Sequence, residues 1–365
     1  MKRYYYIDDE VDTIKSIADG INESNMVHVD VFPLAKFKEF DKLTQQLRNE
    51  WNDIDGLILD LKLNGGGDDS TKFTATSLAQ WISSYVVVDH KEAKPIVLLS
   101  NDLQCANFKA DITSHDLFDM VLERSGGLDW KEFARKLAVL ADDYDELNQS
   151  KEKNLSELLQ NDSIDTSSTY FAPFLEPAVF NVSQFASFVL NDLFIHPGLL
   201  ISEELLAARY GVDMDKSGTA WNNFKTKYLG VAQYRGMFGR IAERYWSKKA
   251  QEVFAQITKG KNAASMTTIQ RVTSLKTYSE EAKDLVAYEP SDKDISTYCW
   301  AIDEVTKKPL DSSTGYMIQE EGGLKSWQEP RFLSFDTIES GNKGDIRLVP
   351  SEQERYNEDL AALDD

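Results

Sequence analysis

The chain has 365 residues, 42% of them hydrophobic, and its 61 acidic and 40 basic residues give a formal charge of −21. This length suits two domains with ordinary cores, because a domain usually spans about 100–200 residues. No apolar run approaches the roughly 20 residues that a membrane-spanning helix needs, and the acidic excess excludes a general affinity for polyanions.

The charge is spread unevenly along the chain. Residues 1–150 hold 16 Lys and Arg against 28 Asp and Glu, residues 151–277 hold 15 against 12, and residues 278–365 hold 9 against 21. Only the middle segment could therefore attract a polyanion. Cys105 and Cys299 lie far apart, and the N-terminus turns acidic before a signal-peptide core could form. Both features predict a cytoplasmic protein with reduced thiols.

Residues 1–148 alternate between strand and helix patterns. Strands are predicted at 3–7, 27–32, 56–60, 95–100 and 117–122, and helices at 11–21, 37–51, 73–86, 103–112 and 130–147. The third strand is a continuous apolar run, which is typical of a strand buried on both faces of a parallel sheet. Five strand–helix repeats predict an α/β fold, a doubly wound five-stranded parallel sheet with helices on both faces.

Polar side chains occur where the predicted strands end. Asp8 and Asp9 follow the first strand, and Asp60 follows the third. Ser100 closes the fourth strand, and Arg124 follows the fifth. Any one of these residues alone could be a helix cap or part of a solvated turn. Together they indicate a single site, because the carboxyl ends of parallel strands meet at one edge of the sheet, where α/β proteins bind ligands.

Residues 1–148 resemble the receiver domain of two-component response regulators, which has a flavodoxin-like fold. That family has an acidic pair after the first strand, an aspartate after the third, serine or threonine after the fourth and lysine after the fifth. The present chain departs from the pattern at Arg124, which replaces the lysine. Asn64 and Ser125 stand where the family commonly has proline.

The resemblance implies that Asp60 accepts a phosphoryl group from a histidine kinase or a phosphotransfer protein. Asp8, Asp9 and Asp60, with the backbone carbonyl of Lys62, would hold the Mg²⁺ that neutralises the transferring group. Ser100 would donate a hydrogen bond to a phosphoryl oxygen.

Arg124 would pair with another phosphoryl oxygen. Arginine keeps the charge of lysine, but it is longer and planar and is no neutral replacement. A degenerate receiver that is not phosphorylated is therefore the alternative for this half of the chain.

The second half predicts a linker over 149–172 and a helical output domain over 173–282. Helices are predicted at 183–194, 202–211, 219–229, 231–257 and 266–278. The fourth of these is the longest, because Tyr234, Phe238, Ile241 and Tyr245 recur at helical spacing.

A DNA-binding interpretation of the helices around 202–249 competes with protein binding. Residues 207–227 could form a helix-turn-helix, and residues 216–249 contain eight Lys and Arg against one acidic residue. The turn between the helices is long, however, and acidic segments flank the region. We therefore expect the C-terminal module to bind a protein, with a transcription regulator as the alternative.

Residues 283–365 predict a small β-rich segment and an acidic tail. Strand patterns at 297–302 and 315–318 suggest a small β-hairpin or β-subdomain, and residues 327–335 suggest a further strand. Residues 352–365 predict an acidic helix or a loose tail. No nucleotide-binding or catalytic motif follows residue 150. We expect no enzymatic activity beyond phosphorylation and dephosphorylation of the receiver, with an enzyme of unrecognised C-terminal site as the remaining alternative.

Overall fold

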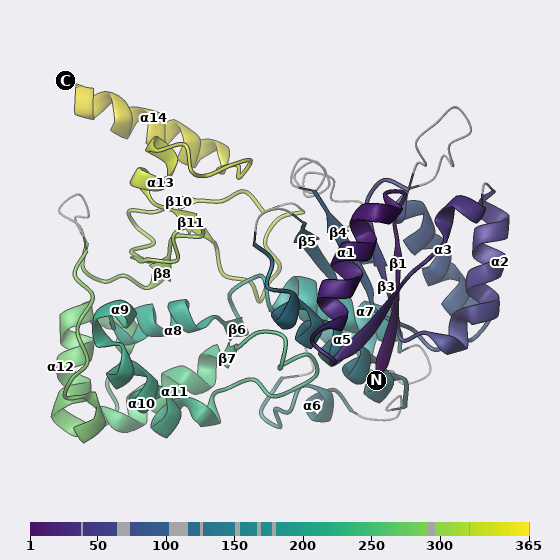
Figure 1. Cartoon of the computed structure of the whole chain (residues 1–365). Helices are drawn as coiled ribbons and strands as arrows, with labels where there is room; N and C mark the ends of the chain where they lie inside the picture. The colour runs from purple at the N-terminus through teal and green to yellow at the C-terminus, as the bar shows by residue number, and fades with distance from the viewer. Residues whose placement is uncertain are drawn as a thin grey trace. The chain divides into compact units, whose positions relative to one another are not determined.

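The computed structural model of the chain describes residues 1–37, 39–63, 74–101, 116–124, 127–149, 154–165, 169–176, 180–290, 296–320 and 322–364. These residues form two compact units (Figure 1). Unit 1 comprises Met1–Asp192 and Arg235–Ala242, and unit 2 comprises Leu193–Tyr234 and Glu243–Asp365. The chain therefore returns to unit 1 once, for a short segment, before it completes unit 2.

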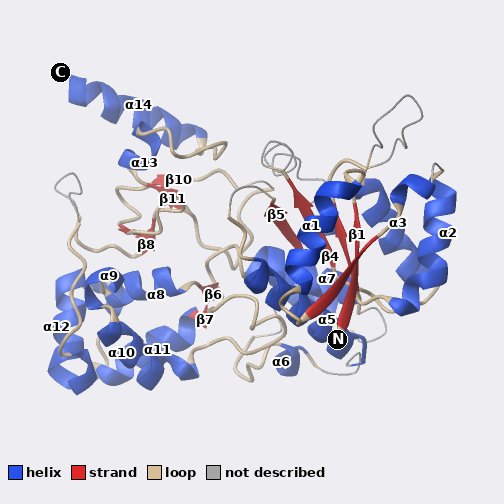
Figure 2. Ribbon diagram, in the orientation of Figure 1, coloured by secondary structure: helices blue, strands red, loops and turns tan. Residues whose placement is uncertain are grey.

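Unit 1 is built on a parallel sheet with the strand order β2-β1-β3-β4-β5. Its strands are β1 (Lys2–Ile7), β2 (Val27–Val31), β3 (Gly56–Leu59), β4 (Ile96–Ser100) and β5 (Met120–Glu123). The helices between and after them are α1 (Val11–Asn22), α2 (Phe40–Glu50), α3 (Ala75–Val88) and α5 (Trp130–Gln149). Helices α1 and α5 cover one face of the sheet, and α2 and α3 cover the other (Figure 2). This is the doubly wound, flavodoxin-like order, so the predicted fold class of residues 1–148 is confirmed.

The central strands are buried as their sequences predict. Every residue of β3 and β4 is buried, which is possible only between two helical layers. Gly56 opens β3 because a Cβ there would lie 2.2 Å from a ring atom of Tyr4. The Tyr4 ring is fully buried, and its hydroxyl donates to the carbonyl oxygen of Leu137 on α5 at 2.7 Å. The helix predicted at 103–112 lies outside the described residues.

Unit 1 extends well past residue 148, the predicted end of the receiver-like segment. Helices α6 (Leu155–Leu158) and α7 (Val182–Ser187) and a 3-10 helix at Thr169–Phe174 belong to this unit, as does all but the last residue of a π-helical turn at Phe188–Leu193. The described part of the predicted linker at 149–172 is thus packed into the unit, because Leu155, Leu158 and Phe171 are buried.

The returning segment of residues 235–242 packs on helix α5. The N–H of Phe238 donates to Asp143 Oδ2 at 2.6 Å, Arg240 Nη2 donates to Asp143 Oδ1 at 2.6 Å, and the rings of Phe238 and Tyr144 meet edge to face. The predicted helix at 231–257 is therefore wrong in its first half. Only α11 (Ser247–Ile257) is helical, after the short strand β7 (Tyr245–Trp246).

Backbone geometry explains this correction. Phe238 has a φ of 63°, a left-handed conformation that no helix interior contains, and the N–H of Tyr234 donates to the carbonyl oxygen of Arg244 across a loop. Gly236 and Gly239 lie within that loop, and glycine weakens a helix by about 1 kcal/mol relative to alanine. Tyr234 and Phe238 have the spacing of residues on one helix face, but Tyr234 is buried in unit 2 and Phe238 in unit 1.

Unit 2 is mostly helical with three small antiparallel sheets. Its other helices are α8 (Glu203–Tyr210), α9 (Met214–Ser217), α10 (Thr219–Tyr228), α12 (Thr268–Tyr278), α13 (Phe335–Glu339) and α14 (Pro350–Asp364). Its strand pairs are β6 (Leu200–Ile201) with β7, β8 (Ala301–Ile302) with β9 (Pro309–Leu310), and β10 (Tyr316–Met317) with β11 (Phe332–Leu333). The predicted class, helical followed by a small β-rich segment, is confirmed.

In unit 2, the prediction for helix α8 is confirmed and the predicted strand pairing is corrected. Helix α8 begins and ends as predicted, because the Ser202 hydroxyl caps its first turn and Gly211 ends it with a φ of 76°. Residues 301–302 and 316–317 do not pair with each other as a hairpin, because β8 pairs with β9 and β10 pairs with β11, so the β-subdomain alternative holds. Among the described residues, no helix combines the length and apolarity that crossing a membrane requires.

Candidate functional site

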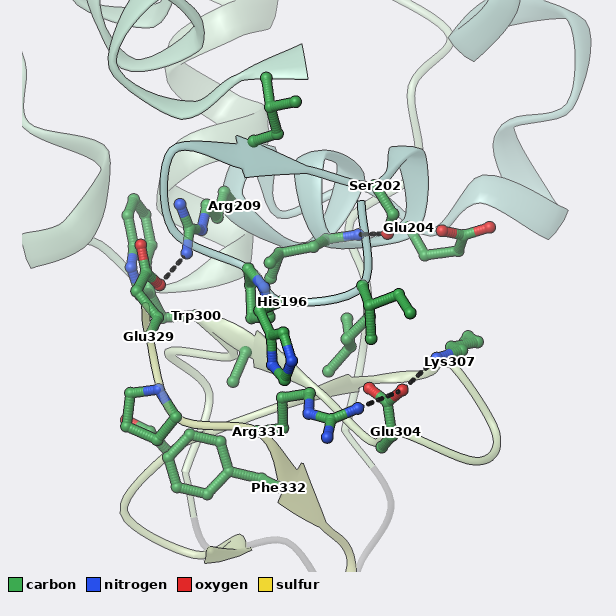
Figure 3. A pocket seen from close by; sticks show the side chains of 18 of the residues that line it. His196, Ser202, Glu204, Arg209, Trp300, Glu304, Lys307, Glu329, Arg331 and Phe332 are labelled. Atoms are coloured by element: carbon green, nitrogen blue, oxygen red, sulfur yellow. Dashed lines mark hydrogen bonds and ion pairs between the residues drawn. The ribbon is translucent and has the colours of Figure 1, made fainter. Parts of the chain in front are cut away.

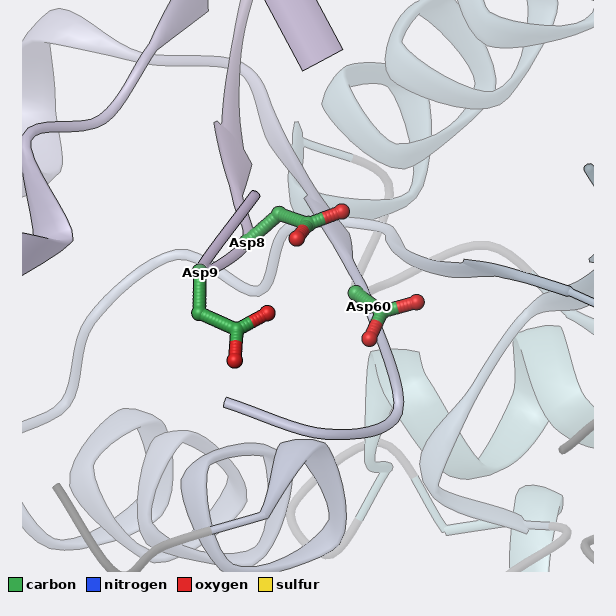
Figure 4. A group of neighbouring side chains, drawn as sticks. All are labelled: Asp8, Asp9 and Asp60. Carbon is green, nitrogen blue, oxygen red and sulfur yellow. The ribbon is translucent and has the colours of Figure 1, made fainter. Parts of the chain in front are cut away.

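Three carboxylates converge at the carboxyl end of the sheet in unit 1. Asp8, Asp9 and Asp60 each offer an oxygen atom, and these atoms lie within 4.8 Å of one another (Figure 4). The strand register explains the convergence, because Ile7 of β1 is the partner of Leu59 of β3, so the next residue of each strand also lies side by side. Asp8 and Asp60 are buried, and Asp9 is half-buried.

Hydrogen bonds fix the orientation of the Asp60 carboxylate. Its Oδ1 accepts from the hydroxyl of Ser100 at 2.8 Å, and its Oδ2 accepts from the backbone N–H of Lys62 at 3.0 Å. Ser100 is the last residue of β4, which neighbours β3, and it is fully buried. The structure therefore brings Ser100 to Asp60, as the strand-end pattern predicts. The proposed role of the Lys62 carbonyl as a metal ligand stays a prediction.

The cation after β5 lies against Asp8. Arg124 Nη1 donates to Asp8 Oδ2 at 2.8 Å, and its Nη2 donates to Glu10 Oε2 at 3.2 Å. The other Asp8 oxygen accepts from the backbone N–H of Glu10 at 2.8 Å. The length of the arginine side chain and its forked guanidinium make this double contact possible. Sequence reasoning singled out Arg124 but missed Glu10 as its second partner, although Glu10 directly follows the acidic pair.

Burial and mutual repulsion raise the pKa values of the cluster. Burial raises the pKa of Asp8 to about 6, and the neighbouring Asp9 adds to the rise, while the Glu10 N–H and Arg124 oppose it. The pKa of Asp60 is raised by burial and then by Asp8, against the hydrogen bonds from Ser100 and Lys62. Each carboxylate is thus held in a place that disfavours its charged form, and a bound cation would remove that penalty.

The donor set suits a hard divalent cation. Mg²⁺ prefers oxygen ligands and is commonly held by one or two carboxylates together with phosphate oxygens and water. Three carboxylates with oxygens this close together fit such an ion, whereas zinc prefers nitrogen and sulfur ligands. The positions of Asn64 and Ser125 lie outside the described residues.

The basic segment at 216–249 looks different in the structure from its sequence. Lys225 pairs with Glu203 at 2.8 Å and with Glu243 at 3.3 Å, and Lys227 pairs with Glu281. In helix α10, Trp221 and Phe224 are buried in the core of unit 2. Helix α10 (Thr219–Tyr228) is the second helix of the predicted helix-turn-helix. One of its faces packs into the core of unit 2, and its two lysines are neutralised by ion pairs.

Unit 1 has the flavodoxin-like strand order, with three aspartates, a serine and an arginine gathered at the carboxyl edge of its sheet. Among solved structures, the chain is similar to the phosphorylated cyanobacterial phytochrome response regulator RcpA, with 17% sequence identity and a TM-score of 0.25, over 41% of this chain and 94% of that one. No family model matches the chain, and no curated protein matches it either.

Proposed function

We propose that the chain is a response-regulator-like signalling protein in which Asp60 is phosphorylated and Asp8, Asp9 and Asp60 hold Mg²⁺. The observation that carries this proposal is the close group of three carboxylates, with Ser100 bonded to Asp60 and a cation beside Asp8. Asp60 and Ser100 are buried but lie at a strand end, where a small phosphodonor can approach.

The chemistry is an in-line phosphoryl transfer. An oxygen of the Asp60 carboxylate forms the new bond to phosphorus while the bond between phosphorus and the donor breaks, and the leaving group keeps that electron pair. A Mg²⁺ held by Asp8, Asp9 and Asp60 would supply the positive charge that lets the anionic carboxylate and the anionic phosphoryl group approach each other. The Ser100 hydroxyl donates to Asp60 Oδ1 before the reaction. Once Asp60 carries the phosphoryl group, the hydroxyl can rotate and donate to a phosphoryl oxygen.

Arg124 must leave Asp8, at least in part, to reach the phosphoryl group. Its guanidinium is well placed for this exchange because its Nη2 bond to Glu10 involves an exposed carboxylate and costs little to break. The contact between Arg124 and Asp8 also explains the alternative of a degenerate receiver. In that case, Arg124 stays paired with Asp8, which then does not bind a metal ion.

We further propose that the output of the chain is protein binding. Unphosphorylated or phosphorylated, the protein is strongly acidic, and DNA affinity comes chiefly from cations that neutralise phosphates. The ion pairs of Lys225 and Lys227 withdraw two such cations in unit 2. A histidine kinase or phosphotransfer protein would act on unit 1, and a protein partner would bind the C-terminal module.

Intact-mass measurement tests the phosphorylation. The full chain is incubated with acetyl phosphate and Mg²⁺, and we expect a gain of one phosphoryl group that EDTA abolishes. Asp60→Asn should show no gain, because an amide cannot act as the nucleophile. Asp89→Asn is the matched control, since Asp89 is an exposed aspartate at the end of α3. An equal gain in Asp60→Asn, or no gain in the unsubstituted chain, refutes the proposal, and the latter outcome favours the degenerate receiver.

A further inference from the structure

Unit 2 contains a cavity of about 460 Å³. Its walls come from residues 194–209, from Arg244 and from residues 300–332, all of which belong to unit 2. This volume lies within the range of small-molecule sites, which are usually about 300–1,000 Å³. No motif in the sequence marks it, and phosphorylation of Asp60 does not involve it.

Part of the wall is apolar and aromatic. Phe194, Leu205, Trp300 and Phe332 line the cavity. Such surfaces bind the apolar body of a ligand, and a few polar groups then fix its orientation. Trp300 is flanked by two arginines, with Arg209 5.1 Å and Arg271 5.4 Å from its ring centre.

Arg209 is a buried cation whose hydrogen bonding is incomplete. Its side chain is 3% exposed, its Nη1 donates to Ser247 Oγ at 2.7 Å, and its Nη2 donates to Glu329. Its Nε–H is buried and finds no acceptor among the residues that the structure describes. Burial lowers the pKa of Arg209, which means that the site disfavours the positive charge that it holds.

Arg244 has no carboxylate partner within ion-pair distance in the described part of the chain. Its Nε and Nη2 donate to the carbonyl oxygen of Phe194 at 2.9 and 2.8 Å, and its Nη1 donates to the carbonyl oxygen of Glu243 at 2.9 Å. A guanidinium has five N–H donors, so two remain for a ligand. Burial lowers the pKa of Arg244 as well, while Glu204 and Glu304 oppose that effect from a distance.

The other charged groups at the cavity are already paired with one another, apart from Glu204. Arg331 bonds Glu320 at 2.7 and 2.8 Å, and Glu304 pairs with Lys307 at 3.0 Å. Figure 3 shows the Glu304 carboxylate between Arg331 and Lys307, and the Glu204 carboxylate pointing away from His196. Among the described residues, Arg244 is therefore the cation of this cavity that makes no direct ion pair, although Glu204 and Glu304 lie near enough to favour its charge.

We propose that this cavity binds a small organic anion, a carboxylate or phosphate attached to an aromatic or other apolar body. Arg244 would receive the anionic group with its two remaining N–H donors, and Trp300 and Phe332 would contact the apolar body. Arg209, whose charge is balanced by Glu329, packs against the Trp300 ring and holds it in the wall. The proposal goes beyond phosphorylation of Asp60 and stands independently of it.

Matched probe pairs test the charge requirement on the full chain. Binding of benzoate against benzamide, and of phenyl phosphate against phenol, is followed by calorimetry. We expect at least one anion to bind saturably in the millimolar range or tighter, and its neutral counterpart to bind at least tenfold more weakly. Preference for benzoate or for phenyl phosphate tells which anion the site takes. Saturable binding by neither anion, or equal binding of the neutral partner, overturns the proposal.

Variants then assign the binding to this cavity. Arg244→Gln should weaken binding of the anion at least tenfold, whereas Arg347→Gln, which removes an exposed arginine of the same unit, should leave it unchanged. Equal losses in both variants would mean a general charge effect and would contradict the assignment. Ile195→Trp is the second variant, because Ile195 lines the cavity and is 50% exposed, so enlarging it narrows the site without disturbing the core. Ile195→Trp should weaken the binding of the anion and of the neutral compound equally. Unchanged binding would mean that the compounds bind at another site. Circular dichroism and melting temperature check that each variant is folded.

Discussion

In unit 1, carboxylates from two neighbouring strands meet at one sheet edge, whereas in unit 2 two arginines from separate segments, Arg209 of α8 and Arg244 before β7, line one cavity. Burial disfavours the charged form of the side chains in both places. It raises the pKa of Asp8 and lowers the pKa values of Arg209 and Arg244. Like charges gathered out of water are costly unless a ligand of opposite charge arrives. The comparison supports the two proposals, that the carboxylates of unit 1 bind a cation and that Arg244 of unit 2 binds an anion.

The two units also differ in how their backbones pack. Unit 1 is held by a continuous sheet between helical layers, while the strands of unit 2 pair over two residues each. In unit 2, a buried hydrophobic cluster holds the helices together, and α8 and α12 approach closely at one glycine. At Gly211, a Cβ would lie 2.6 Å from the carbonyl oxygen of Thr268, at the start of α12.

The largest effect on stability is expected from Gly211→Ala. The substitution combines a φ of 76° with a backbone clash, and we expect unit 2 to lose about 3 kcal/mol of unfolding free energy. Gly260→Ala is the control, because Gly260 has a φ of 91° with nothing within 4 Å, and it should cost only about 1 kcal/mol. Urea unfolding measures both. Phosphorylation of Asp60, read by intact mass, should persist in the Gly211 variant, since the site belongs to unit 1. Equal costs in the two variants would mean that the contact with Thr268 does not matter.

The next effect concerns the pH dependence of Mg²⁺ binding. The Asp8 pKa of about 6 in the folded protein means that protons compete with the metal at lower pH. Because Mg²⁺ binds the deprotonated carboxylate, its affinity should rise as the pH rises through 6 and should fall about tenfold per pH unit below that value. Calorimetric titration at pH 5, 6 and 7.5 measures this. The Asp8→Asn variant should bind Mg²⁺ weakly, and its Mg²⁺ affinity should depend less on pH. A constant affinity over this range in the unsubstituted chain argues against Asp8 as a ligand.

A smaller effect is expected at Arg124. Arg124→Ala frees an oxygen of Asp8 and removes a positive charge, so Mg²⁺ affinity should rise by about fivefold or less, the usual size of a single ion-pair contribution. Binding of beryllofluoride, an analogue of the phosphoryl group, should weaken in the same variant, and Arg124→Lys should retain it. If both substitutions leave beryllofluoride binding unchanged, the guanidinium does not contact the phosphoryl group. Absence of beryllofluoride binding in the unsubstituted chain would instead favour the degenerate receiver.

The smallest expected effect is the response to duplex DNA. We expect no binding tighter than roughly 10⁻⁵ M near physiological salt, which is the non-specific range. A mobility-shift titration with random-sequence and genomic fragments measures it. Tight and sequence-dependent shifts would show that the cations of unit 2 are available despite their ion pairs, and would support the transcription-regulator alternative.

The sequence by itself predicted the parallel sheet of unit 1 and the polar side chains that lie at its carboxyl edge. Apolar runs ending in Asp8, Asp60 and Ser100 suffice, because parallel strands place their carboxyl ends at one edge whatever the details of packing. Local signals also determined helix α8, where the Ser202 cap and the Gly211 stop act within one turn.

Only the tertiary structure decided the features that depend on distant residues. The spacing of Tyr234 and Phe238 imitates a helix, yet the two rings are buried in different units, and periodicity alone cannot tell one core from two. The contact of Arg124 with Asp8 depends on the reach of a side chain across the sheet edge. The cavity at Arg244 has walls from three separated parts of the chain, and no local pattern encodes a space that exists only after those parts have packed together.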